Sequence, residues 1–124
     1  MFQHMANNII VLNRGDSYSF NLTIVDENSE SGIYNLEGDD AVYLGIMDPH
    51  QPFELALVKK KYTVEDLDEA GNLFIEILPE DTVDLFPGIY YYSIKLKIDH
   101  TDDDGFEFSG VKTIINNTKF ILCD

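Results

Sequence analysis

The carboxylates of one acidic turn are the side chains whose types and spacing come nearest to metal chemistry. The turn spans Asp99–Glu107 and reads DHTDDDGFE. Hard cations such as calcium prefer several oxygen ligands, and the candidate ligands here are Asp99, Asp102, Asp103 and Asp104. The spacing is not that of an EF-hand loop, because placing Gly105 at the sixth position puts His100 first and Val111 twelfth. A charged hairpin tip is therefore the favoured interpretation, and neither a metal nor another cofactor is expected.

Catalysis by an activated serine would require a histidine that is itself held by a carboxylate. His4, His50 and His100 lie in polar stretches, and no serine is set in a GxSxG sequence. We expect all three histidines to face solvent, and we expect acids such as Asp39 and Asp40 to be solvated as well. The sequence thus predicts no catalytic residue and a protein that is not an enzyme.

The basic residues include one short run. Lys59, Lys60 and Lys61 are followed by Tyr62, and these four residues are the candidate interaction site. Lysines along a strand commonly protect an open sheet edge from pairing with another chain. They can instead meet an acidic surface on a neighbouring copy, and both interpretations stay open at this point.

Exposed aromatic rings are a further candidate, because flat aromatic faces stack on sugars. Among three consecutive tyrosines, strand alternation directs Tyr90 and Tyr92 inward and leaves Tyr91 outward. Tyr90 follows a Pro-Gly turn, as in the tyrosine corner of many sandwiches, whose hydroxyl bonds to backbone upstream. By parity, Tyr43 and Phe53 join Tyr91 as the aromatics that a carbohydrate-binding surface would use.

Length and charge limit what these candidates can bind. The chain has 124 residues, with 8 Lys and Arg against 23 Asp and Glu, and a formal net charge of -15. This length suits one domain over residues 1–124, in which we expect residues 1–8 to be flexible. The acid excess repels phosphate backbones and anionic lipid, so neither nucleic acid nor membrane is an expected partner.

Alternating apolar and polar residues predict the strands that would position these side chains. The pattern is clearest over residues 17–25, 42–46, 73–77 and 90–98, and shorter versions occur at 9–12, 55–62, 106–108, 111–115 and 118–122. One short helical turn is expected near residues 80–86, with Leu85 and Phe86 packed inward. The polar segment Asp26–Asp40 is expected to be an exposed, mobile loop.

Each of these strands has one polar and one apolar face. The apolar faces are buried most simply when two sheets pack against each other. The sequence therefore predicts an all-β antiparallel sandwich of about seven to nine strands. A closed barrel is the alternative. A helix-covered sheet is disfavoured, because no amphipathic run reaches the length of a helix.

The order of these segments resembles a known family. The chain runs through IIVLNRGDSYSFNLTIVD, GDDAVYLGIMDP, KKKYT and AGNLFIEILPEDTVDLFPGIYYYSIKL, and then through VKTIINNTKFILCD. This succession is similar to the immunoglobulin-like β domains of tailed-phage and prophage virion proteins, especially the N-terminal domain of baseplate upper proteins. The resemblance covers roughly residues 9–122, and its motifs are structural rather than catalytic.

The resemblance implies an immunoglobulin-like sandwich that serves as a non-enzymatic structural component of a phage or prophage tail or baseplate. Its partners would be other tail or baseplate proteins, or further copies of the chain in a homo-oligomer. The protein would be made in the bacterial host cytoplasm without a signal peptide and would reside in the virion. The alternative is a stand-alone carbohydrate- or ligand-binding sandwich module.

Overall fold

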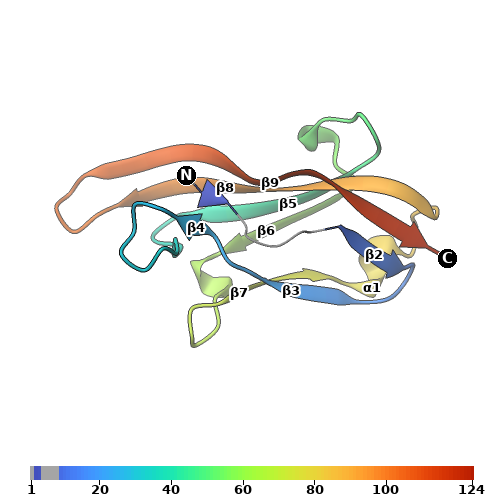
Figure 1. The fold of residues 1–124 in the computed structure, drawn as a ribbon, viewed down its shortest axis with the longest axis horizontal. Helices are drawn as coiled ribbons and strands as arrows, with labels where there is room; N and C mark the ends of the chain where they lie inside the picture. The colour runs from blue at the N-terminus through green and yellow to red at the C-terminus, as the bar shows by residue number, and fades with distance from the viewer. Residues whose placement is uncertain (1, 4–8) are drawn as a thin grey trace.

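The computed structural model describes residues 2–3 and 9–124, which form two layers of strands in an elongated molecule (Figure 1). The elements are β1 (Phe2–Gln3), β2 (Ile10–Asn13), β3 (Tyr18–Leu22), β4 (Val25–Asp26), β5 (Ala41–Met47), η1 (Phe53–Leu55), β6 (Val58–Thr63), η2 (Val64–Asp66), β7 (Leu73–Ile77), α1 (Pro79–Thr82), β8 (Gly88–Thr101) and β9 (Glu107–Cys123). We expected residues 1–8 to be flexible, and six of them, residues 1 and 4–8, lie outside the described part of the chain. No helix among the described residues is both long and apolar enough to cross a membrane.

The larger sheet has five strands in the order β2-β9-β8-β5-β6, and the β3-β7 pair forms the opposing layer (Figure 1). A third small pair joins β1 to β4. This arrangement confirms the predicted all-β sandwich. One pair differs from the antiparallel expectation, because β2 runs parallel to β9. Alternation specifies which face of a strand is buried but not the direction of its neighbour, so the pattern could not predict this pairing.

The hydrophobic core fills the space between the two layers. In β7 the side chains alternate between buried and exposed along the whole strand, as expected for one face on the core and one in solvent. The largest fully buried side chains are Tyr92 from β8 and Phe120 from β9. Tyr90 and Tyr92 both face this core, which confirms the predicted parity of the three tyrosines.

The predicted strands at 111–115 and 118–122 are parts of one long strand, β9. Its register with β8 shifts on either side of Ile94. The interruption lies opposite the buried Ser93, whose hydroxyl accepts the backbone N–H of Asn117 at 3.0 Å. A β-bulge of this kind bends a strand without ending it, so the two apolar runs belong to the same element.

The helical turn expected near residues 80–86 corresponds to α1 and the turn that follows it. Leu85 packs against the core as predicted, but the prediction for Phe86 is wrong, because its side chain is 83% exposed. Two adjacent residues leaving a helical turn point in different directions, so only one of them reaches the core. The Phe86 carbonyl accepts the Tyr90 hydroxyl at 2.5 Å, which confirms the tyrosine corner.

The expectation of an exposed loop over Asp26–Asp40 is also wrong in part. Leu36 and Asp40 are buried within it. The backbone N–H of Tyr34 donates to the carbonyl of Ile24 at 2.8 Å, and Val25 forms an isolated bridge with residue 33. The segment is therefore anchored to the sandwich at several points along its length.

Candidate functional site

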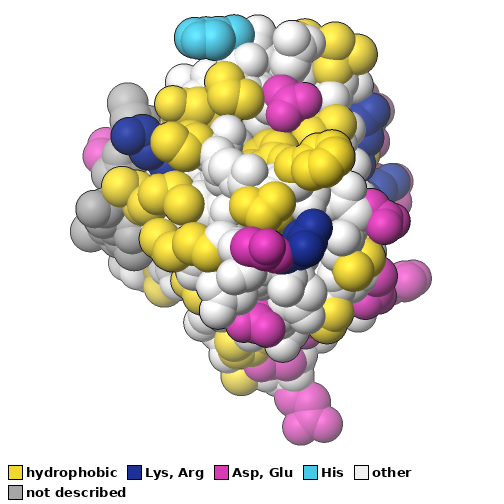
Figure 2. All heavy atoms as spheres, turned by 90° about the vertical axis from the view of Figure 1, so that its right-hand side faces the viewer, with side chains coloured by type: hydrophobic (Ala, Val, Ile, Leu, Met, Phe, Trp, Pro, Cys, Tyr) yellow, Lys and Arg dark blue, Asp and Glu magenta, His cyan; other side chains and the backbone are white. Residues whose placement is uncertain are grey.

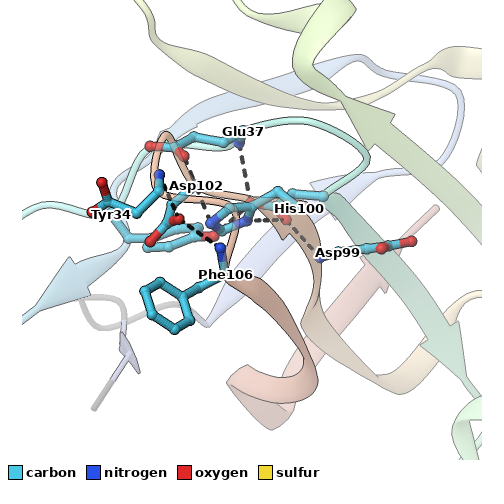
Figure 3. Close-up of polar contacts among 8 residues, drawn as sticks. Tyr34, Glu37, Asp99, His100, Asp102 and Phe106 are labelled. Atoms are coloured by element: carbon cyan, nitrogen blue, oxygen red, sulfur yellow. Dashed lines mark hydrogen bonds and ion pairs between the residues drawn. The ribbon is translucent and has the colours of Figure 1, made fainter.

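A buried carboxylate lies where the connection from β4 to β5 meets the end of β8. Its partners Tyr34, Glu37, Asp99 and His100 are labelled in Figure 3. Asp40 is fully buried, and its Oδ1 accepts the backbone N–H of Asp99 at 2.7 Å and pairs with His100 Nδ1 at 2.9 Å. Its Oδ2 accepts the backbone N–H of Glu37 at 3.1 Å and the hydroxyl of Tyr34. The two carboxylate oxygens thus have four donors between them, which offsets the cost of removing the charge from water.

His100 completes this cluster from the end of β8. Its ring stacks on Phe108 with centroids 5.2 Å apart, and its Nε2 lies 3.6 Å from a carboxylate oxygen of Glu37. The expectation that Asp40 and His100 are solvated is therefore wrong for both residues. Side chains that converge from distant segments create the buried site, and no local sequence pattern announces it.

Burial and hydrogen bonding together shift the pKa values of Asp40, His100 and Tyr34. Burial raises the pKa of Asp40, but hydrogen bonds from Tyr34, Asp99 and His100 outweigh it and hold the pKa below its ordinary value. The hydrogen bond to Asp40 has the largest effect on His100 and raises its pKa above the usual value, while burial opposes it. Burial, followed by the bond to Asp40, raises the pKa of Tyr34.

The arrangement favours a structural role over catalysis for Asp40 and His100. A histidine that acts as a general base needs a nitrogen within reach of the substrate proton that it removes. Here Nδ1 faces Asp40 and Nε2 faces Glu37, and the histidine side chain is 9% exposed. Together the residues join the 34–40 segment to the β8–β9 hairpin.

The structure does not bring the four acids of the Asp99–Glu107 turn together around one point. Asp102 Oδ1 accepts the backbone N–H groups of Asp104 and Phe106 at 3.0 and 2.9 Å, so this carboxylate shapes the hairpin turn. Asp99, Asp103 and Asp104 are exposed. Within residues 2–3 and 9–124, no group of three His, Cys, Asp or Glu residues could hold a metal ion.

The run Lys59, Lys60, Lys61 and Tyr62 lies on β6, an edge strand of the larger sheet. Lys60 Nζ is 2.6 Å from a carboxylate oxygen of Asp81 in α1, which directly follows β7 of the opposing layer.

The Tyr62 hydroxyl contacts both backbone groups of Glu76 on β7, at 3.3 Å to the carbonyl and 3.1 Å to the nitrogen. Lys60 and Tyr62 therefore close this side of the sandwich, whereas Lys59 and Lys61 are exposed. The use of the run as an interaction site stays a prediction.

The three aromatic residues predicted to face outward have different surroundings. Lys61 Nζ lies 5.9 Å from the ring centroid of Tyr43, and Lys95 Nζ lies 4.8 Å from that of Phe53. These two rings thus already carry cations from the same chain. Tyr91 instead lines a hollow together with polar side chains.

Exposed apolar side chains gather at the end of the sandwich that carries α1 and the C-terminus (Figure 2). Ile121 on β9 lies in register between Val11 on β2 and Ile89 on β8. Phe86 and Val83 lie in the turn that leads into β8. We call these five residues the end patch; Ile121 is half-buried and the other four are exposed. Its most exposed members are Phe86 at 83% and Val11 at 61%.

Sequence reasoning missed the end patch because it assigned Phe86 to the core. The available signal was the adjacent pair Leu85 and Phe86, of which only one could face inward.

No family model, curated protein or solved structure matches this chain.

Proposed function

We propose that this protein is a non-enzymatic structural component of a phage or prophage tail or baseplate, and that it acts by binding other proteins. The sequence resemblance supplies the assignment to a virion, and the end patch supplies the contact surface. The observation that carries the proposal is the exposure of Phe86, at 83%, among other apolar side chains.

An exposed apolar surface of this kind has a clear energetic use. Fully burying a side chain such as Phe or Val is worth roughly 1.5–3 kcal/mol. Contiguous exposed apolar patches mark interaction sites on folded proteins, and a few central side chains usually carry most of the binding energy. Phe86 has the exposure for that role, and it lies in the turn that leads into β8, three residues before Ile89 of the end patch.

Charge determines what kind of partner fits this surface. The net charge of -15 makes two copies repel each other. A partner with an apolar centre and a basic rim would be attracted instead. Homo-oligomers would require high salt, which screens the repulsion. Lys59 and Lys61 offer a secondary contact for an acidic partner surface, as the sequence suggests.

To test the proposal, the proteins encoded by the neighbouring genes are identified and co-expressed with the full chain. We expect tail or baseplate proteins among them, and we expect at least one to co-purify with this chain. Phe86→Asp should abolish co-purification, because an aspartate that replaces this ring in the interface would be buried without a partner. Phe106→Asp is the matched control, because Phe106 is 68% exposed in the hairpin at the opposite end of the molecule.

Two results would overturn the proposal. Neighbouring genes that encode only metabolic enzymes would remove the virion assignment. Equal loss of binding in the Phe86 and Phe106 variants would remove the end patch as the contact surface.

A further inference from the structure

A hollow on the outer side of the larger sheet combines one aromatic ring with several polar side chains. Its volume is about 460 Å³, which lies within the range of small-molecule binding sites. The lining residues come from the β5–η1 connection, from β8 and from β9, and they are Asp48, His50, Gln51, Pro52, Tyr91 and Asn117.

Two residues with left-handed backbone conformations line this hollow. Among the non-glycine residues that the structure describes, only His50 and Asn117 have positive φ, at 67° and 41°, and both line the hollow. Such conformations are unfavourable for residues with a Cβ and persist where the surrounding structure enforces them. They cluster at functional sites, where the strain directs a side chain toward a ligand.

Asn117 is held in place by the bulge in β9. Its backbone N–H donates to Ser93 Oγ at 3.0 Å, and the Ser93 hydroxyl donates to Asn117 Oδ1 at 3.2 Å. Ser93 is buried, so this pair of bonds fixes the asparagine from beneath. The Asn117 side-chain nitrogen retains its two donor hydrogens for a ligand.

The opposite wall is the connection from β5 to η1, and it is also well supported. The Gln51 N–H donates to the Asp48 carbonyl at 3.1 Å, which closes the turn that contains His50. The ring of Phe53 lies against Gly45, where an added Cβ would come within 2.6 Å of it. Both walls are therefore preformed, which reduces the entropy that binding must overcome.

We propose that this hollow binds a neutral saccharide, a function that goes beyond protein assembly and does not depend on it. The apolar face of Tyr91 would pack against the C–H face of a sugar ring. The side-chain amides of Asn117 and Gln51 and the carboxylate of Asp48 would bind its hydroxyls, which both donate and accept hydrogen bonds. Asp48 and the net charge of -15 disfavour anionic ligands.

The test is an NMR titration of the full chain with cellobiose, lactose and N,N′-diacetylchitobiose as neutral probes. We expect at least one to shift the backbone amide signals of residues 48, 50, 51, 91 and 117, with a dissociation constant of about 1 mM. Tyr91→Ala should weaken that binding by about tenfold or more. Tyr43→Ala is the matched control, since Tyr43 is an outward aromatic on the same sheet but outside the hollow, and it should bind as the unaltered protein does.

Glucose 6-phosphate, as an anionic probe, is expected to bind more weakly than the neutral sugars. The proposal is overturned if no neutral probe shifts the signals of the hollow, or if Tyr91→Ala binds as well as Tyr43→Ala does. Phe86→Asp should retain sugar binding, and Tyr91→Ala should retain the protein partner, so each proposal can fail without the other.

Discussion

At the scale of single residues, Asp40 shows what composition cannot reveal. In a chain with 23 Asp and Glu residues, any one acid is expected to be solvated. Asp40 is buried because its donors converge from two parts of the chain, Tyr34 and Glu37 nearby and Asp99 and His100 far away in the sequence. Only the folded structure brings those two parts together.

The pH dependence of unfolding should report this cluster. The pKa of His100 is raised on folding, so its stabilisation is complete below the unfolded value of about 6.5 and is lost as pH rises through the folded pKa. The pKa of Asp40 is lowered, so its stabilisation is present above about 3.9 and is lost as pH falls through its folded pKa. The cluster therefore stabilises the fold most between about pH 4 and 6.5.

Urea unfolding at a series of pH values measures this effect. His100→Asn should remove the part of the stability loss above about pH 6.5 that comes from His100, whereas His50→Asn, at an exposed histidine, should leave that loss unchanged. Asp40→Ala should lower the free energy of unfolding by about 3–5 kcal/mol, because it removes one partner of a buried pair. This account would be contradicted if, above pH 6.5, the free energy of unfolding fell equally steeply with pH in the unaltered protein and in His100→Asn.

At the scale of elements, alternation predicted most strands and their buried faces, including Tyr90 and Tyr92 inward on β8. It could not predict the parallel pairing of β2 with β9, since that depends on chain direction. It also divided β9 into three segments, at 106–108, 111–115 and 118–122. The break before residue 118 lies at the bulge at Asn117, where the period is interrupted while Ser93 keeps the strand continuous. Local pattern thus specifies faces, and tertiary contacts specify the partners.

Gly45 provides a test at this scale, because its missing side chain lets the β5–η1 connection fold back over the sheet. An added Cβ would lie 2.6 Å from one carbon of the Phe53 ring and 3.2 Å from the Ala56 Cβ. Gly45→Ala should therefore lower the free energy of unfolding by about 1–3 kcal/mol, the usual cost of overpacking, and should weaken sugar binding by displacing the wall of the hollow. Chemical denaturation and the same titration measure the two effects.

The companion variant is Phe53→Leu, which removes the ring that the new methyl group meets. Gly45→Ala should lower the free energy of unfolding less when Phe53→Leu is also present than when it is made alone. A double-mutant cycle measures this difference. Strictly additive losses would show that the close packing of Gly45 against Phe53 does not position the connection.

At the scale of the whole molecule, the two proposed surfaces are assembled from segments far apart in the sequence. The sequence predicted that Tyr91 faces outward, but it could not place Asp48 and Asn117 beside it. Its one signal of the end patch was the adjacent pair Leu85 and Phe86, and it could not bring together the segments β2, β8, β9 and the turn after α1 that form the patch. The net charge was evident from the composition, and the partner that we propose would carry basic residues around an apolar centre.

Hydrogen–deuterium exchange on the full chain, alone and with a co-purified tail or baseplate partner, tests the central claim most directly. Burial of the end patch should slow exchange over residues 83–89 and 119–123, and it should leave the hairpin at 101–107 unchanged. Slowed exchange at 101–107 with no change over 83–89 would show that the partner binds the opposite end, and would contradict the account.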